Sequence, residues 1–197
     1  MTGFVRSFNV VSIDPGFVHM GMVAAVVTVV DDMAVVAEMR CKTLKVCNSP
    51  LEAADTEKLA DSIDRKIGRF LYEKNMTHGT CLIEKTWGGR GYSLLSTGLK
   101  SLEIHLYHYF TNDNWRAELI APSSVKRHFA IATKAYASNK SAAVAFANSH
   151  LASADDDDED ICIRDLDSHQ ADCVNQLYYW LTQKYPAASV ELRLIET

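Results

Sequence analysis

Three apolar segments follow one another at the start of the chain, and only short turn signals separate them. Residues 8–13 end at Asp14-Pro15-Gly16, residues 20–30 form a valine-rich run, and two aspartates lead into residues 33–39. Aspartate before Pro-Gly is typical of a turn, and β-branched runs of this length are typical of strands. The opening of the chain therefore predicts three consecutive antiparallel strands, and a further hairpin is expected after residue 39.

Helical and strand patterns alternate in the rest of the chain. Ser49-Pro50 offers a helix start, and apolar residues then recur at helical spacing up to Leu71. Three strands followed by this alternation predict an α/β domain with a five-stranded mixed sheet, three strands antiparallel and two parallel, flanked by helices. This layout resembles that of the RNase H-like fold. Strands are expected at residues 80–84 and 118–121, and helices at 93–110, 123–129, 139–151 and 167–184.

The length and composition fit a single globular domain over residues 1–197. The chain has no apolar run of 18 residues and no signal-peptide pattern at its start, so neither a membrane span nor secretion is expected. Five cysteines, an odd number without C-x-x-C spacing, predict free thiols in a reducing intracellular compartment rather than disulfides or a zinc site.

The net charge of −5 conceals an uneven distribution. Residues 85–140 contain eight Lys or Arg and three acids, whereas residues 151–172 contain nine acids and one arginine. A basic middle suits phosphate binding and an acidic segment suits metal binding, although ordinary solvated charge gives the same counts. The acidic run at 155–160 is interpreted as a flexible loop at about residues 153–162, with a cation site as the alternative.

Two carboxylates stand directly at the ends of apolar strands. Asp14 ends the first strand and Glu84 ends the strand at residues 80–84, where hydrophobic residues are usual. His169 and Asp172 are spaced i, i+3 near the start of the last helix, so they share one face. Each residue alone also fits an ordinary turn, surface or helix-start role. Together, and in this order, they indicate a metal site that one sheet brings together.

Such a set of ligands suits the hydrolysis of phosphodiesters. Mg²⁺ prefers carboxylate oxygens, and two ions about 3.5–4 Å apart stabilise both the attacking and the leaving oxygen. Asp14 is expected to bridge two Mg²⁺ ions, with Mn²⁺ as a substitute, while Glu84 and Asp172 each complete one ion. His169 is expected to bind an ion or to carry a proton near neutral pH.

The order of these motifs resembles that of RuvC-type Holliday junction resolvases, from about residue 8 to residue 182. The Ile-Glu-Lys sequence is also similar to that of the viral branch, which includes poxvirus and iridovirus resolvases. The resemblance rests on three acidic motifs, Ser12-Ile13-Asp14-Pro15-Gly16, Leu82-Ile83-Glu84-Lys85 and His169-Gln170-Ala171-Asp172, and on two basic segments, Pro122-Ser123-Ser124-Val125-Lys126 and Asn139-Lys140-Ser141-Ala142-Ala143.

This resemblance implies a homodimeric, Mg²⁺-dependent endodeoxyribonuclease that resolves four-way DNA junctions by paired cuts, acting inside the cell where DNA is replicated. It implies that Asp14, Glu84 and Asp172 bind the metal ions. His169 stands where many members have Asp and some have His, so Asp167 and Asp165 remain alternatives for the fourth ligand.

Basic and aromatic residues around these motifs are expected to contact DNA. Lys126 is expected beside the active site, against a scissile or neighbouring phosphate. Trp87 lies in a glycine-rich segment, where it either stacks at an unpaired junction centre or packs as a loop tip. The other residues expected to bind the DNA backbone are Lys85, Arg90, Arg127, Lys134 and Lys140.

The helix at residues 93–110 is apolar on more than one side. We expect it to cover the core and also to join two subunits about a two-fold axis, through Leu94, Leu102 and Tyr109. Two functions compete with junction resolution: another RNase H-like nuclease acting on RNA–DNA hybrids or single strands, and a non-catalytic nucleic-acid-binding module. A nucleotide-binding protein of the actin and sugar-kinase type normally requires two such domains and a longer chain.

Overall fold

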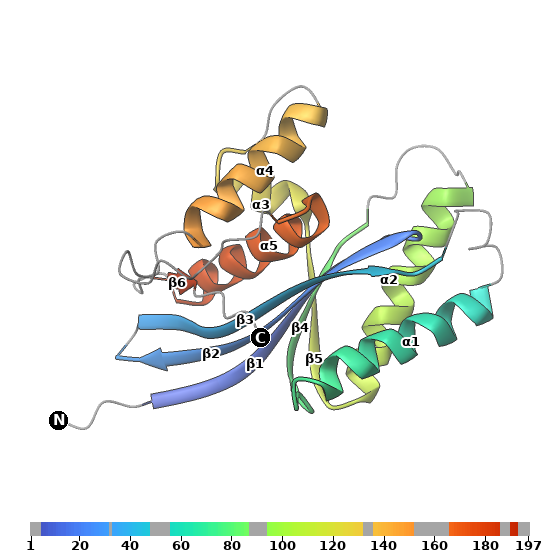
Figure 1. The fold of residues 1–197 in the computed structure, drawn as a ribbon, viewed down its shortest axis with the longest axis horizontal. Helices are drawn as coiled ribbons and strands as arrows, with labels where there is room; N and C mark the ends of the chain where they lie inside the picture. Colours follow the sequence, from blue (N-terminus) through green and yellow to red (C-terminus); the bar gives the residue numbers. More distant parts are fainter. Residues whose placement is uncertain are drawn as a thin grey trace.

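A twisted sheet with helices on both faces forms the centre of the protein (Figure 1). The computed structural model describes residues 5–31, 33–47, 56–86, 94–131, 136–151, 166–185 and 190–192. Within these residues the sheet has the strand order β5-β4-β1-β2-β3-β6. The strands are β1 (Val5–Asp14), β2 (His19–Val30), β3 (Met33–Lys45), β4 (Gly79–Glu84), β5 (Trp115–Ile120) and β6 (Val190–Leu192), and the helices are α1 (Thr56–Tyr72), α2 (Leu94–Asn112), α3 (Pro122–His128), α4 (Tyr136–Leu151) and α5 (Ser168–Lys184).

The predicted arrangement of three antiparallel and two parallel strands is confirmed. β1 pairs antiparallel with β2, and β2 pairs antiparallel with β3. β4 runs parallel to β1, and β5 runs parallel to β4. Because parallel strands need crossover connections, α2 lies between β4 and β5 in the chain. The carboxyl ends of β1 and β4 consequently lie side by side at one edge of the sheet.

Two details of the sheet differ from the prediction. The hairpin expected after residue 39 is wrong, because β3 continues to Lys45, which pairs with His19 at the start of β2. A sixth strand, β6, pairs parallel with β3 through only three residues. A strand that short carries no readable alternation of polar and apolar residues, so the pattern gave no sign of it.

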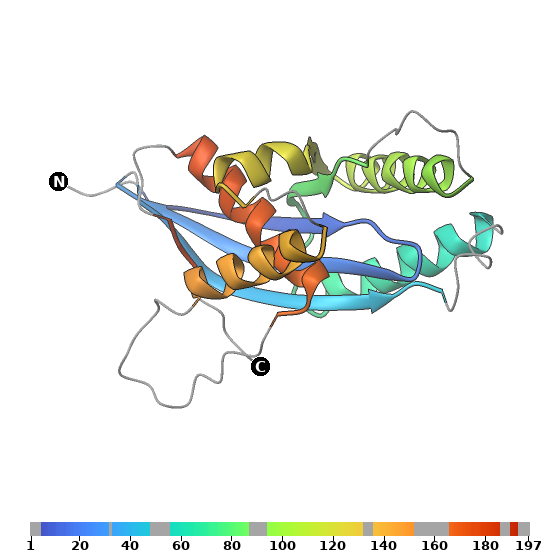
Figure 2. The ribbon, with the colours of Figure 1, turned by 90° about the horizontal axis from the view of Figure 1, so that it is seen from above.

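Alternate residues of β1 point to opposite faces and so belong to different cores. Val10 packs with α4 and α5, whereas its neighbour Val11 packs with α1 and α2. Figures 1 and 2 show these two pairs of helices on opposite sides of the sheet. Since Ile13 belongs to the α1–α2 core, Asp14 at the next position faces α5.

The predicted helices are found, with small shifts at their ends. The proposed start at Ser49-Pro50 and the acidic segment at about 153–162 lie outside the described residues. Within the described residues, every helix is too short or too polar to cross a membrane.

The start of α5 is fixed by a capping box, in which the Asp167 side chain accepts hydrogen bonds from the backbone N–H groups of His169 and Gln170.

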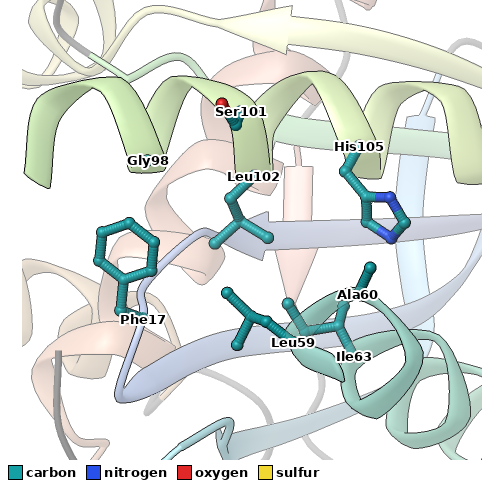
Figure 3. A pocket seen from close by; sticks show the side chains of 8 residues that line it. All are labelled: Phe17, Leu59, Ala60, Ile63, Gly98, Ser101, Leu102 and His105. Atoms are coloured by element: carbon teal, nitrogen blue, oxygen red, sulfur yellow. The ribbon is translucent and has the colours of Figure 1, made fainter. Parts of the chain in front are cut away.

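Of the three residues of α2 assigned to a subunit interface, Leu102 needs correction, and the side chain of Leu94 lies outside the described residues. Leu102 is only 4% exposed, and Figure 3 shows its side chain in the space between α1 and α2, beside a small apolar pocket of about 170 Å³. Tyr109 packs against the same core. Among the α2 residues whose side chains are described, the large apolar ones that are exposed are Ile104 and Tyr107, at 48% and 38%. Leu102 therefore serves the fold and is not available to a second subunit.

The close approach of α5 to β2 depends on Gly21. A Cβ atom on Gly21 would lie 2.4 Å from the backbone oxygen of His169, far inside normal contact. We predict that Gly21→Ala displaces α5 and lowers the free energy of unfolding by about 1–3 kcal/mol. Gly68→Ala is the matched control, because its new Cβ would meet only the Tyr109 hydroxyl at 3.5 Å. Urea denaturation should show a gain of about 0.5–1 kcal/mol for the control, and equal stability of the two variants would contradict this account.

Candidate active site

Asp14 and Glu84 are brought together by the parallel pairing of their strands. The register aligns Ser12 with Leu82 and Ile13 with Ile83, so the two acids that follow are neighbours. Leu82 lies in the core under α5, and side chains alternate along a strand, so Glu84 points to the same face as Asp14. The sheet thus presents two adjacent carboxylates toward the start of α5.

Helix α5 completes the cluster from above the sheet. Asp14 lies opposite Gly21 in the β1–β2 pair, and His169 packs directly over that glycine. His169 Nδ1 is 2.8 Å from Asp14 Oδ2, so the ring and the carboxylate share a hydrogen bond. Asp172 lies one turn further along the same helix face. The four residues singled out in the sequence therefore come from three elements and meet at one place.

The carboxylates at this edge are partly buried and repel one another. Burial raises the pKa of the Glu84 carboxyl well above its usual range, and the charges of Asp14 and Asp172 raise it further, against an opposing effect of Lys126. Burial, followed by the charge of Asp14, raises the pKa of Asp172 to about 6. Each of these two acids is therefore costly to ionise where it stands, and positive charge would stabilise it.

Lys126 supplies positive charge at the cluster. It lies in the last turn of α3, which begins with Pro122. Lys126 lines a small pocket together with Glu84, Asp172 and Asn175. Its charge lowers the pKa of both Glu84 and Asp172. The structure therefore places Lys126 beside the carboxylates, where the sequence analysis expected it.

The hydrogen bond to Asp14 raises the pKa of His169, although burial of the ring opposes the change. The charge of Lys140, in α4, lowers the pKa of both His169 and Asp172, so Lys140 also lies near the cluster. The raised pKa favours the protonated form of the His169 ring. The ring is thus suited to donating or accepting a proton at this edge of the sheet.

Asp167 has a structural task that separates it from the cluster. Its carboxylate accepts hydrogen bonds from two backbone N–H groups of α5 and from the hydroxyl of Thr43. These bonds take up three of the roughly four acceptor positions of the carboxylate. The geometry therefore favours His169 over Asp167 as the fourth polar group beside Asp14. Asp165, the other alternative, lies outside the described residues.

The chemistry of the donor set fits Mg²⁺, which binds through one or two carboxylates and completes its shell with water and substrate phosphate. Among the described residues, no three His, Cys, Asp or Glu side chains form a ready cage for a single ion. In the pocket beside Glu84 and Asp172, Asn175 Oδ1 is buried without a hydrogen-bond partner in the described structure. An oxygen in that position can accept a hydrogen bond from a water that belongs to such a shell.

Other residues that hold the site were not found in the sequence. The nearly buried Glu103 of α2 accepts hydrogen bonds from the backbone N–H and the hydroxyl of Thr86, at 2.7 and 2.6 Å, and pairs with Lys100. Thr86 lies two residues after Glu84, so Glu103 fixes the path of the chain as it leaves β4. Only its burial distinguishes Glu103 from a surface acid, and a helical pattern does not reveal burial at one polar position.

The remaining residues expected to contact DNA are placed only in part. Lys85 and Arg127 are exposed, next in sequence to Glu84 and Lys126 respectively. Trp87, Arg90 and Lys134 lie outside the described residues, so their roles stay predictions.

No protein-family model matches the sequence, and no curated protein matches it significantly. Similar folds do occur among solved structures. Thermus thermophilus RuvC in complex with a Holliday junction substrate has a TM-score of 0.60 and 16% identity, over 89% of this chain and 95% of that one. A second structure of Thermus thermophilus RuvC gives 0.58 and 16%, over 90% and 97%. Fowlpox virus resolvase in complex with its Holliday junction substrate gives 0.53 and 12%, over 91% and 97%.

Strand order, helix layers and these similarities define an α/β protein with the RNase H-like fold. More narrowly, the chain has the fold of RuvC-type resolvases. A bacterial and a viral structure both match over about nine tenths of the chain at low identity. The assignment to the viral branch therefore stays a prediction.

The raised pKa of Asp172 predicts how stability depends on pH in metal-free buffer. Well below pH 4 the side chain is protonated in both the folded and the unfolded state. Between about pH 4 and pH 6 the unfolded chain ionises while the folded carboxyl keeps its proton, so stability falls by on the order of 2–3 kcal/mol and stays lower above pH 6. We predict that Asp172→Asn raises the melting temperature at pH 7.5 and barely changes it at pH 4.

Asp61→Asn, at an exposed position in the first half of α1, is the matched control and should change the melting temperature little at either pH. Adding Mg²⁺ at pH 7.5 should stabilise the wild type more than Asp172→Asn. A variant that is less stable than the wild type at pH 7.5 would show that Asp172 is not under electrostatic strain.

Proposed function

We propose that this protein is a divalent-metal-dependent endonuclease that resolves four-way DNA junctions. The observation that carries the proposal is the convergence of Asp14, Glu84 and Asp172 at the carboxyl edge of the sheet, with His169 and Lys126 beside them. The support from the fold is that two of the similar structures are resolvases in complex with Holliday junction DNA.

The mechanism assigns each residue a task at the scissile phosphate. Asp14, Glu84 and Asp172 would hold two Mg²⁺ ions, with Mn²⁺ as a substitute. When bound, such ions polarise the phosphate and generate a nucleophile from water near neutral pH. The protein itself contributes a rigid edge, because Asp14 and Glu84 are fixed by strand pairing and Asp172 by the buried face of α5.

His169 and Lys126 handle protons and charge around that edge. His169 is held by Asp14 through Nδ1 and has a raised pKa, so it can deliver or remove a proton close to pH 7. Lys126 lies beside Glu84 and Asp172, where its charge offsets repulsion between these carboxylates and an incoming phosphate. The exposed Lys85 and Arg127, with Lys140 near the cluster, would bind the DNA backbone without reading its sequence.

Paired cuts in a two-fold symmetric junction require two active sites, whereas one chain of this fold offers one. We therefore propose a homodimer, in which a two-fold axis relates the two sites. Ile104 and Tyr107 on the outer face of α2 are the exposed apolar side chains that favour this helix as part of the interface. The flanks of α2 must contribute as well, since stable dimers bury roughly 1,200–2,000 Å².

The proposal is tested with a synthetic four-way junction, a linear duplex of the same sequence and an RNA–DNA hybrid, each with Mg²⁺, Mn²⁺ or EDTA. We expect paired cuts in the junction only, and only with metal. Asp14→Asn, Glu84→Gln and Asp172→Asn should each slow cutting by about a thousandfold or more while junction binding is largely kept. Asp61→Asn should cut like the wild type.

Preferential cutting of the hybrid would favour the alternative RNase H-like activity. If no substrate is cut with either metal ion while the junction is still bound, the protein is a binding module rather than a nuclease.

His169 separates a proton-carrying role from a metal-binding role. His169→Ala should lower the cutting rate by about 10²–10⁴-fold, because either role is lost. If the residue binds metal, His169→Asp should recover part of the rate with Mg²⁺; if it carries a proton, the Asp variant should instead shift the pH profile to lower pH. His108→Ala, at an exposed position of α2, is the control. Full activity of His169→Ala would remove this residue from the mechanism.

A further inference from the structure

A second hollow lies at the other end of β1 from the carboxylates. β1 begins at Val5, but its pairing with β4 begins only at Val10, opposite Thr80. The first residues of β1 therefore pair with β2 on one side and border a hollow of about 610 Å³ on the other. The starts of β4 and β5 and the C-terminal end of α5 form its other walls. This volume is within the range of small-molecule and nucleotide sites.

Basic side chains from four elements or connections line this hollow. Arg6 comes from β1, His78 from the turn before β4, Arg116 from β5 and Lys184 from α5. Glu118 forms ion pairs with Arg116 at 3.1 Å and with Lys184 at 3.8 Å. The single Glu118 carboxylate thus offsets only part of the three permanent positive charges of Arg6, Arg116 and Lys184. Arg116 and Lys184 each keep further N–H donors that a ligand can use. The hollow suits an anionic ligand.

Aromatic side chains form a wall beside these cations. Phe8 contacts Tyr185 in a stacked arrangement, with ring centroids 6.5 Å apart, and meets Trp180 edge to face at 6.3 Å. Arg6 lies over the ring of Phe8, and Lys184 lies over the ring of Trp180. The Trp180 indole also donates a hydrogen bond to Glu118, which fixes the wall to the ion pairs. Phe8 and Tyr185 are only partly buried, so their rings remain available to a ligand.

We infer that this hollow binds a nucleotide unit of single-stranded nucleic acid, with the base on the aromatic wall and the phosphate on Arg6 and Arg116. Stacking combined with backbone charge is how proteins hold single strands without reading their sequence. An added peptide strand is the other occupant that an open sheet edge can take, but the cations and aromatic rings favour a nucleotide.

The site is separate from the proposed catalytic edge. Phe8 and Asp14 are six residues apart on one strand, a span of about 20 Å. In β4, Glu84 is the last residue, whereas the hollow is lined by the first residues of that strand. In α5, Lys184 is the last residue, whereas His169 lies at the start of the helix. A segment bound here and a phosphate bound at Asp14 therefore do not compete for the same contacts. Binding in the hollow does not depend on catalysis, so it goes beyond the proposed nuclease function.

The test measures the affinity of the full chain for a labelled oligothymidylate by fluorescence anisotropy in EDTA. The double variant Arg6→Ala/Arg116→Ala should weaken binding about tenfold or more and reduce the salt dependence by about two phosphate contacts. Tyr185→Ala should weaken binding about fivefold or more, because it removes a stacking surface. Arg69→Ala, which removes one positive charge at an exposed position of α1, should leave the affinity unchanged.

Lys126→Ala separates the two sites, since its effect on binding should be independent of the Arg6/Arg116 pair. Competition by free thymidine monophosphate would identify single nucleotides as ligands, and competition by the oligonucleotide alone would identify a strand. Melting temperatures of all variants confirm that they are folded.

Three results would overturn the inference. The first is equal affinity in the double variant and in Arg69→Ala. The second is a loss of affinity in the arginine double variant while Tyr185→Ala binds the oligonucleotide like the wild type, because charge alone would then explain the binding. The third is competition by inorganic phosphate or by an acidic peptide that matches that of the oligonucleotide. If junctions are not cut but these variants behave as expected, the nuclease proposal fails and this site stands.

Discussion

The contact of α5 with the β1–β2 pair is the constraint on which the candidate site depends. Gly21 allows the backbone of His169 to lie directly on β2, and Asp14 stands opposite that glycine. The same contact brings His169 within hydrogen-bond distance of Asp14. It also brings Asp172 into the pocket that Glu84 lines. A side chain at position 21 would separate the helix from the sheet and divide the cluster into two halves.

Holding this cluster together costs stability. Glu84 and Asp172 are buried near Asp14, and their raised pKa values express the cost of ionising them without a cation. Lys126 offsets part of that cost, and bound metal would offset more. The fold supplies the opposing free energy through the two apolar cores on either side of the sheet. An edge that is strained without cations is suited to binding them when substrate arrives.

The two ends of β1 differ in charge. Its carboxyl end carries Asp14 beside Glu84, and its amino end carries Arg6 in the hollow lined by Arg116 and Lys184. The net charge of −5 hides this difference, because the opposite charges cancel in the sum. The basic middle of the sequence, residues 85–140, in fact divides between the two ends, with Lys126 at one and Arg116 at the other.

The sequence by itself determined the class of fold and which acids stand at the ends of its strands. Strands with carboxylates at their ends, such as residues 80–84, can be predicted from the sequence because the local apolar pattern and the turn residues determine where such strands begin and end. The sequence did not determine that Leu102 is core, that Asp167 is a helix cap, or that Glu103 holds Thr86, because each depends on which face of an element meets which neighbour. Only the tertiary structure decided these, and it alone joined Arg6, Arg116 and Lys184, three cations far apart in the chain, in one hollow.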